Sequence, residues 1–349
     1  MFDLLLYVSF LVSTFILIPA FVATVSISWL FSLGVKLVAR LVRARVTQRF
    51  DDCGAVWAVD DLTKRGYTNI VIRLVFKGTI TLDQLRSQVQ TKLLSWEEDS
   101  DKRRKFWRLK QRWTTFLGYL FWEPIPDFHL SQHVRLYDLT QSQLALPAVV
   151  TEENLNRISS AYLSHPTPKA CPWELLLIPH YVPANGEDEP HCVILSKFHH
   201  ALTDGTGILD FFQCLFDNEH EGNAIIRLNR FPVRTLLQKL TRTLSIALRI
   251  PFDFSNVALA AFKGQNEWIS LTKALPQDCE TYVSDAISLK SVMEIAKREK
   301  VNATAVAHAL ATGAILRMMA DNGQKIGDCI SFVCAYPLEG HPGGLTNNV

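Results

Sequence analysis

The residues best suited to chemistry lie in one short run, His-His-Ala-Leu-Thr-Asp-Gly at positions 199–205. An apolar run, 192–198, precedes the two histidines, and a helix-like run, 208–216, follows the glycine. A histidine placed where a strand ends can reach a cleft while the strand behind it fixes its orientation. Because imidazole titrates at about pH 6.5, such a side chain is mostly neutral in cytosol and can accept the proton of a hydroxyl group.

Three interpretations of this run compete. In the first, His200 is a general base that removes the proton of a hydroxyl group as it attacks a thioester, which typically accelerates a reaction about 10²–10⁴-fold. In the second, His199, His200 and Asp204 bind a metal, but adjacent histidines on extended backbone point in opposite directions and no further ligand motif stands nearby. In the third, both histidines are ordinary polar residues at a strand end. The Asp204-Gly205 pair at a fixed offset and the strand-to-helix context favour the general base.

The composition narrows the possibilities. The chain has 349 residues, of which 48% are hydrophobic and 20% charged, and this suits a globular protein of about two domains. A net charge of +2 gives no electrostatic reason to expect a nucleic-acid partner. The seven cysteines form no CxxC pair, which favours free thiols in a reducing compartment over disulfides or a zinc site. No GxSxG, HExxH, Walker A or GxGxxG motif supports nucleophilic hydrolysis or nucleotide chemistry.

The N-terminal region predicts membrane attachment. No charged residue and no histidine occurs from Leu4 to Val35, a stretch longer than the roughly 20 residues that a spanning helix needs. Pro19 lies at its centre, so one tilted span and a re-entrant hairpin are both open. A signal peptide is disfavoured because no basic residue precedes the apolar stretch. Basic residues follow at once and place the rest of the chain on the cytosolic side: Lys36, Arg40, Arg43, Arg45 and Arg49.

Strand and helix patterns alternate along the chain and predict an α/β fold. Three apolar runs are typical of strands: 70–76, 173–178 and 192–198. The polar segment 183–190 is expected to be the hairpin loop between the last two. We therefore expect the histidine motif, which follows the third strand, to lie at the edge of a sheet and to face a cleft.

Helical spacing of apolar residues predicts five further elements: 82–93 after a Thr81–Gln84 capping box, 151–165, 208–216, 289–296 and 302–320. The basic, aromatic stretch 101–113 favours a solvated helix face with buried tryptophans over a patch for a CoA phosphate or an anionic membrane. From 237 to 249, leucines alternate with basic residues, which predicts an amphipathic helix on a membrane surface or, equally, a crossover helix packed on the protein. A last strand is predicted at 330–335, before a Gly/Pro-rich loop.

Five segments, in the right order, resemble the wax ester synthase/diacylglycerol acyltransferase family, within the HHxxxDG superfamily of CoA-dependent acyltransferases. They are 122–135, Pro172-Trp173-Glu174, the strand and motif at 193–205, the small-residue helix from Val301 to Arg317, and the loop 337–348. The resemblance extends from about residue 65 to the C-terminus. Two departures stand out. Ala303 occupies a position where the family usually has Asp, and the chain ends where the second half of the fold should add strands.

The resemblance implies an α/β fold like that of chloramphenicol acetyltransferase, with two halves and the motif at the tunnel between them. It implies that His200 is the general base in a direct transfer without an acyl-enzyme. His199 and Asp204 would support the motif, Asp204 through a buried ion pair with an arginine, and Gly205 would permit the tight turn into the helix. Acyl-CoA would be the co-substrate, with no bound cofactor and no metal. A long-chain alcohol or diacylglycerol would be the acceptor, and an amine is a further possibility.

Four regions follow from these patterns: a membrane anchor with a basic flank at 1–49, an N-terminal acyltransferase half at 50–225, a crossover or amphipathic linker at 226–280, and a truncated C-terminal half at 281–349. We expect an enzyme at the endoplasmic reticulum membrane, with a cytosolic catalytic domain that makes wax esters or triacylglycerol. The alternative is a catalytically impaired or inactive membrane protein that binds lipid or acyl-CoA, because the second half is predicted to be incomplete.

Overall fold

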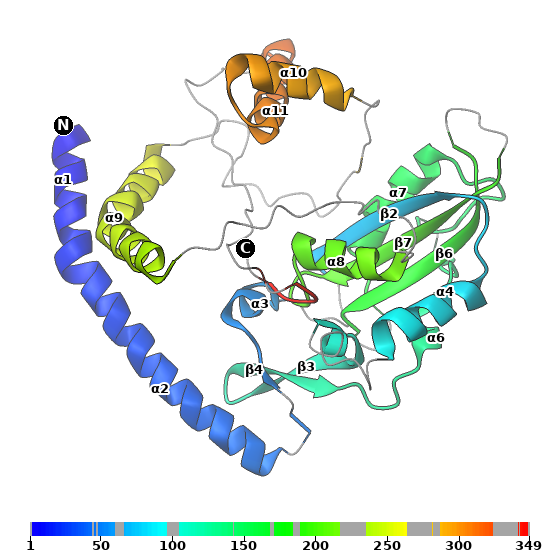
Figure 1. Ribbon diagram of the computed structural model, residues 1–349, viewed down its shortest axis with the longest axis horizontal. Coiled ribbons are helices and arrows are strands. Elements are labelled where there is room, and N and C mark those ends of the chain that lie inside the picture. Colours follow the sequence, from blue (N-terminus) through cyan, green and yellow to red (C-terminus); the bar gives the residue numbers. More distant parts are fainter. Residues whose placement is uncertain are drawn as a thin grey trace. The chain divides into compact units, whose positions relative to one another are not determined.

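The protein divides into two compact units, which we call the helical unit and the sheet unit (Figure 1). The helical unit comprises Met1–Ser28, Val233–Pro276 and Val283–Cys334, and the sheet unit comprises Trp29–Pro232, Gln277–Tyr282 and Ala335–Val349. The computed structural model describes residues 2–43, 45–46, 48–59, 66–95, 105–141, 143–167, 171–183, 189–216, 235–263, 281, 287–323, 341 and 343–347. The mixture of sheets and helices confirms the predicted α/β class, whereas the strand predicted at 330–335 lies outside the described residues.

Two sheets form the frame of the sheet unit. The larger has the order β2-β7-β6-β5, and its strands are β2 (Asn69–Lys77), β7 (His191–His199), β6 (Trp173–Tyr181) and β5 (Val134–Leu136). β7 is antiparallel to both of its neighbours, and β5 is parallel to β6. The smaller sheet is antiparallel and has the order β1-β4-β3, with β1 (Gln48–Arg49), β4 (Tyr119–Pro124) and β3 (Gln111–Phe116). The three strands predicted from apolar runs are confirmed as β2, β6 and β7.

The motif follows the end of an interior strand, which corrects the prediction of a sheet-edge position. β7 is hydrogen-bonded to β2 on one side and to β6 on the other, and every one of its nine residues is buried. Near its end, His199 pairs with Asn69 of β2, and Phe198 pairs with Trp173 of β6. A continuous apolar run shows that both faces of a strand are covered, but it does not show how many strands flank it.

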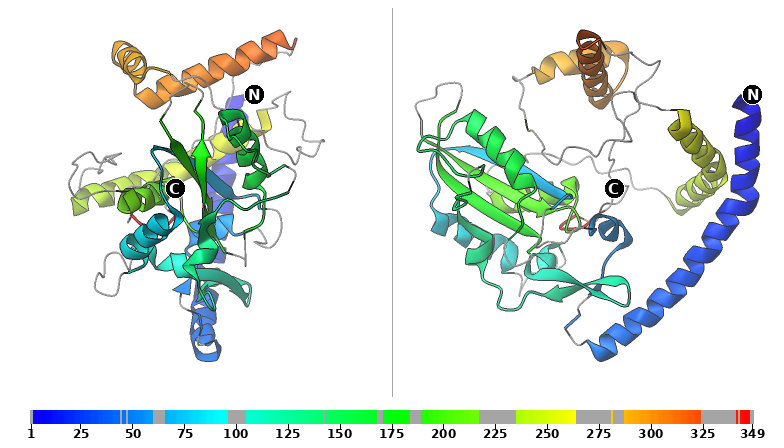
Figure 2. Two further views of the ribbon diagram at one scale, coloured as in Figure 1. Left: turned by 90° about the vertical axis from the view of Figure 1, so that its right-hand side faces the viewer. Right: turned by 180° about the vertical axis from the view of Figure 1, so that it is seen from behind.

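Helices cover both faces of the larger sheet, and alternate strand residues face one layer or the other (Figure 2). On one face, α4 (Leu82–Val89) and α8 (Gly205–Phe216) pack against Leu175, Leu177 and Ile194. On the other, α7 (Glu152–Leu163) packs against Leu176 and Leu195. The predicted helices at 82–93, 151–165 and 208–216 are thus confirmed. The last turn of the first is the π-helical segment η2 (Gln90–Leu94).

The predicted capping box begins α4. The Thr81 hydroxyl accepts a hydrogen bond from the Gln84 amide at 3.2 Å, and the Gln84 side chain accepts one from the Thr81 amide at 2.8 Å. Two amides at the helix N-terminus, which have no partner within the helix, are satisfied in this way. Two shorter helices also belong to the sheet unit, α3 (Asp52–Trp57) and α6 (Leu130–His133).

The prediction of a solvated helix face at 101–113 is wrong for the part of that stretch which the structure describes. Of its described residues, Lys105 and Phe106 are helical but at most half-exposed, and they are followed by one 3₁₀ turn, η3 (Trp107–Lys110), and then by β3. Arg108 is buried and donates to Asp51 Oδ2 at 2.7 Å. The charge is neutralised by a residue more than fifty positions earlier, and a tertiary pairing of that kind leaves no trace in local periodicity.

The N-terminal region is helical throughout, through α1 (Phe2–Val12), the π-helical segment η1 (Ser13–Leu17) and α2 (Ile18–Val42). No turn interrupts the run at Pro19, so the structure favours one span over a hairpin. Within the helical unit, η1 packs against α9 (Leu236–Lys263), where the hydroxyls of Ser13 and Ser255 lie 3.2 Å apart and are both buried. The predicted amphipathic helix at 237–249 is therefore part of a longer helix.

Two more helices belong to the helical unit, α10 (Leu289–Glu299) and α11 (Ala303–Asp321), and both were predicted. Asn302 caps α11 by accepting a hydrogen bond from the Ala305 amide at 2.7 Å. The helix ends at Asp321 and is followed by Asn322 as its C-cap and by Gly323, which has a φ of +65°. By length and composition, two described helical segments are apolar enough to cross a membrane, Tyr7–Val42 and Ala303–Asp321.

Candidate active site

His199 is buried and has hydrogen bonds at both ring nitrogens. Its Nδ1 accepts from the Ala201 amide at 3.1 Å, so the ring proton is assigned to Nε2, which lies 2.9 Å from the Thr68 hydroxyl and donates to it. The same hydroxyl donates to the Trp57 carbonyl at 3.0 Å. His199 is therefore a neutral, fully engaged side chain that supports the motif.

His200 is held differently, by its backbone and by one face of its ring. Its amide donates to the Thr68 carbonyl at 2.8 Å, and its carbonyl accepts from Asn347 Nδ2 at 2.8 Å. The imidazole is half-buried and stacks on the Trp57 ring at a centroid distance of 4.2 Å and an angle of 21°. Nδ1 is enclosed without a hydrogen-bond partner among the described residues. Nε2 is not among these enclosed atoms, so we infer that a reactant would meet the ring at Nε2.

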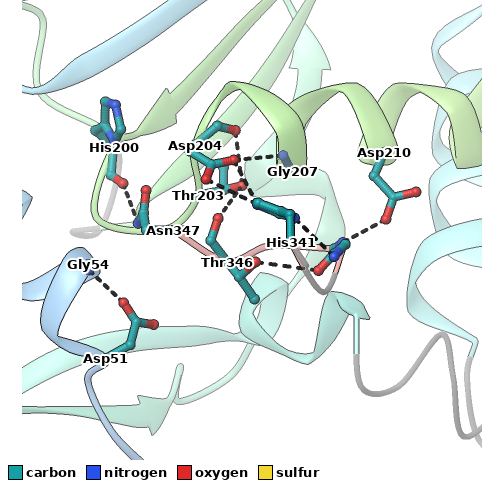
Figure 3. A network of polar contacts seen from close by, with 12 residues as sticks. Asp51, Gly54, His200, Thr203, Asp204, Gly207, Asp210, His341, Thr346 and Asn347 are labelled. Carbon is teal, nitrogen blue, oxygen red and sulfur yellow. Dashed lines mark hydrogen bonds and ion pairs between the residues drawn. The ribbon is translucent and has the colours of Figure 1, made fainter. Parts of the chain in front are cut away.

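Asp204 is buried and caps the N-terminus of α8. Its Oδ1 accepts from the Gly207 amide at 2.9 Å, and both carboxylate oxygens lie 3.1 Å from His341 Nε2 (Figure 3). The Gly343 amide donates to His341 Nδ1 at 3.0 Å, so the ring proton is assigned to Nε2 and points at the carboxylate. The described basic partner of Asp204 is thus a histidine. The arginine expected from the resemblance stays a prediction.

The described residues of the segment 341–347, which are 341 and 343–347, contact the motif in several places (Figure 3). The Thr346 carbonyl accepts from the Asp204 amide at 3.1 Å, and the Gly344 amide donates to Asp210 Oδ2 at 2.6 Å. Together with Asn347 and His341, these contacts tie the segment to the strand end and to the first turns of α8. Sequence reasoning missed all of them, because more than 130 positions separate the partners and the only local signal was a Gly/Pro-rich loop.

Glycine is required at a different position from the one predicted. Gly205 opens α8 without a positive φ, and a Cβ there would meet nothing within 4 Å. At Gly207, a Cβ would come within 2.1 Å of the Thr203 hydroxyl and 2.4 Å of the Gly344 carbonyl. The close approach of the segment 341–347 to α8 therefore depends on Gly207, two residues beyond the end of the HHxxxDG pattern.

Trp57, another residue that the sequence did not reveal, is positioned by α3. Asp51 caps this helix by accepting a hydrogen bond from the Gly54 amide, and its second oxygen accepts from Arg108. Burial lowers the pKa of Arg108, and the neighbouring Asp51 opposes the shift. The buried ion pair fixes the start of the short helix whose last residue, Trp57, stacks on His200.

The geometry suits proton transfer by one histidine. The backbone of His200 and one face of its ring are fixed by neighbouring residues, and a reactant can meet the ring at Nε2. This is the arrangement that a general base needs. Among the residues that the structure describes, no group of three or more histidine, cysteine, aspartate or glutamate side chains could hold a metal ion.

The family described as "Wax ester synthase/diacylglycerol acyltransferase catalytic domain" matches residues 78–317, which include the motif. Comparison with curated proteins gives no match.

Several solved structures are similar. The wax ester synthase/diacylglycerol acyltransferase from Marinobacter aquaeolei VT8 is 18% identical, with a TM-score of 0.34 over 57% of this chain and 46% of that one. The X-domain from teicoplanin biosynthesis is 14% identical, with a TM-score of 0.34 over 66% of this chain and 41% of that one. TRI101 of F. graminearum, solved with coenzyme A and T-2 mycotoxin, is 12% identical, with a TM-score of 0.31 over 49% and 38%. The chain thus spans less than half the length of these proteins.

Proposed function

The chain belongs to the wax ester synthase/diacylglycerol acyltransferase family, and we propose that it transfers a fatty acyl group from acyl-CoA to the hydroxyl group of a lipid. One observation within the motif carries the proposal. The side chains of His199 and Asp204 are buried and hydrogen-bonded, whereas His200 is half-buried and keeps Nε2 open. His200 is therefore the residue to which we assign the general base.

In the proposed reaction, His200 Nε2 accepts the proton of the acceptor hydroxyl while the hydroxyl oxygen attacks the thioester carbonyl. The tetrahedral intermediate then collapses, the carbon–sulfur bond breaks, and the coenzyme A thiolate takes the proton back from His200. The products are an ester and free coenzyme A, with no acyl-enzyme. The Trp57 stack and the two backbone hydrogen bonds of His200 support this step, because they hold the imidazole in one orientation.

We propose a long-chain alcohol or diacylglycerol as the acceptor, because the protein offers apolar surface to a membrane in which such acceptors dissolve. The helical segment Tyr7–Val42 is long enough to span a bilayer, and large apolar side chains along it are exposed, including Phe15, Phe21 and Ile27. The basic residues after it place the catalytic domain in the cytosol, and we propose the endoplasmic reticulum as the site.

The central test is a His200→Ala variant. Membranes that contain the protein are incubated with labelled palmitoyl-CoA and either hexadecanol or diacylglycerol, and ester formation is measured. We expect loss of the base to reduce the rate by about 10²–10⁴-fold. His180→Ala is the matched control, because His180 lies exposed on β6 and outside the motif, and its rate should equal that of the unmodified protein.

Two results would contradict the proposal. Unchanged ester formation in the His200→Ala variant would remove the base. Binding of palmitoyl-CoA without turnover by the unmodified protein would favour the non-catalytic, lipid-binding alternative. A parallel reaction with hexadecylamine in place of hexadecanol tests the acceptor, and amide formation at an equal rate would contradict the preference for a hydroxyl group.

A further inference from the structure

A basic pocket of about 300 Å³ lies in the sheet unit, between the last turns of α2 and the smaller sheet. Its lining includes three cationic side chains, one amide and two apolar residues: Lys36, Arg40, Arg49, Gln48, Val46 and Phe121. No acidic side chain belongs to this lining in the part of the chain that the structure describes. The pocket is separate from the motif, and none of its residues contributes to the site described above.

The end of α2 is fixed on the smaller sheet by an apolar contact. Val35 and Ala39 are buried against Phe121 of β4. Lys36 and Arg40 follow these two residues by one position each, so they are one helical turn apart on the same side of α2. The packing that buries one row of residues therefore presents the neighbouring row, with two positive charges, to the pocket.

Two of the three cations of this pocket lack a balancing carboxylate among the residues that the structure describes. Lys36 and Arg40 form no ion pair with any residue that the structure describes. Arg49, from β1, also lines the pocket, and its guanidinium lies over the Tyr119 ring at 5.8 Å. Like charges gathered around a concave surface repel one another and attract an anion, and phosphate oxygens match both guanidinium and ammonium donors.

The position of the pocket along the chain points to the source of the anion. At about 1.5 Å per residue, the apolar run from Leu4 to Val35 is about 48 Å long, which exceeds the roughly 30 Å hydrocarbon core of a bilayer. The pocket begins at the next residue, Lys36, where the chain leaves the membrane. Phospholipid headgroups lie at this depth, and anionic lipids attract basic residues there.

We propose that this pocket binds the phosphate of an anionic phospholipid headgroup and so fixes the catalytic domain against the membrane. The inference rests on the membrane attachment proposed above. A phosphate group could also come from coenzyme A, so the test must distinguish the two sources.

The test uses the full chain in detergent and native mass spectrometry with added dioleoylphosphatidate or dioleoylphosphatidylcholine. The unmodified protein should retain phosphatidate in preference to phosphatidylcholine. In the double variant Lys36→Gln/Arg40→Gln, we expect phosphatidate binding to fall about ten-fold, because two cations that face the headgroup are lost. The fold of the variant should be unchanged, since both side chains lie outside the apolar contact that fixes α2.

The matched control is Arg43→Gln/Arg45→Gln, which removes two positive charges from the same juxtamembrane stretch but outside the pocket lining. Its phosphatidate binding should fall less than about two-fold, because exposed charges are screened by salt. Equal losses in the two double variants would overturn the proposal, since they would show attraction by net charge rather than a site.

Free coenzyme A supplies the second arm. Displacement of phosphatidate from the unmodified protein by an equal concentration of coenzyme A would also overturn the proposal, because it would assign the pocket to the co-substrate. The His200→Ala variant separates this inference from the proposed function: it should bind phosphatidate as the unmodified protein does, although it makes no ester. Resistance of the protein to extraction from membranes by alkaline carbonate tests the attachment independently.

Discussion

His200 is held by three groups that the sequence places far from it. The Thr68 carbonyl and the Asn347 amide bind its backbone on opposite sides, and the Trp57 ring lies flat against its imidazole. The hydrogen bonds fix where the backbone lies, whereas the stacking fixes the rotation of the ring. Because a general base must meet its reactant in one orientation, we expect the stacking to affect turnover more than substrate binding.

Replacement of Trp57 tests this positioning role. An aromatic pair contributes about 0.5–1.5 kcal/mol beyond its buried area, so Trp57→Leu should lower kcat by about two- to ten-fold with little change in KM. Trp57→Phe keeps a ring face and should recover part of the loss. Steady-state kinetics on reconstituted membranes measure both parameters. A Trp57→Leu variant with an unchanged kcat would show that the stacking has no part in the reaction.

His341 stabilises Asp204 by donating a hydrogen bond to a buried carboxylate. His341→Ala leaves that carboxylate without this donor, and we expect the free energy of unfolding to fall by about 1–3 kcal/mol. His341→Gln retains a donor at nearly the same distance from the backbone and should lose less. Thermal unfolding of the two variants in detergent measures which of them loses more stability. Equal losses would mean that packing, not the hydrogen bond, accounts for the effect.

The motif, the first turn of α8 and the segment 341–347 contact one another at the start of α8. The two glycines of that turn differ in how much space these contacts leave. The first turn must accommodate Asp204 as its cap and the segment 341–347 beside it. Gly207 has no space for a Cβ, whereas Gly205 has open space and an ordinary helical φ. The two glycines are of the same type, lie two positions apart and belong to the same turn, so they form a natural matched pair.

We expect Gly207→Ala to destabilise the protein by about 1–3 kcal/mol, because overpacking forces the Gly344 backbone away from the helix. Activity should also fall, since Asn347 belongs to the same displaced segment and binds the His200 carbonyl. Gly205→Ala should be neutral or stabilising by about 0.4–1 kcal/mol, through the unfolded chain. Urea unfolding and ester formation measure both effects. A destabilising Gly205→Ala and a harmless Gly207→Ala would reverse the assignment.

The elements that the sequence predicted correctly are those whose signals are local. The capping box of α4, the buried face of α7 and the strands around the motif each depend on neighbouring residues. The prediction for the stretch 101–113 was wrong because the charge of Arg108 is neutralised by distant Asp51. A basic residue in a polar stretch can therefore be buried. The motif identified His200, but its supports Trp57 and Asn347 come from distant segments, and no spacing rule connects them.

The sheet unit as a whole has a core that contains ionisable groups. Glu174 is buried and paired with Lys197 and Arg135, each at 2.9 Å. Burial opposes ionisation of Glu174, but Lys197, the Tyr162 hydroxyl and Arg135 together outweigh it and lower the pKa of that carboxyl group. Its contribution to stability is therefore lost only when the pH falls below its ordinary value of 4.5.

His133 gives the fold a separate pH dependence at higher pH. Its ring is buried beside Cys171 and Trp173, and burial, partly opposed by the Trp173 backbone and by Glu174, lowers its pKa from 6.5 to about 4. The unfolded chain then binds more protons than the folded one between these values. Acidification from about pH 6.5 to about pH 4 should consequently reduce the free energy of unfolding, by about 3 kcal/mol from this group.

His133→Phe keeps an aromatic ring between Phe128 and Trp173 but cannot be protonated. Its free energy of unfolding, measured by urea at pH values between about 6.5 and 4.5, should change less with pH than that of the unmodified protein, whatever its absolute stability. Glu174 does not obscure the result, because its contribution is lost at lower pH. His180→Phe, at an exposed position of β6, is the matched control for the change from histidine to phenylalanine. An equal slope in His133→Phe would show that this buried imidazole is not the group that links folding to protons.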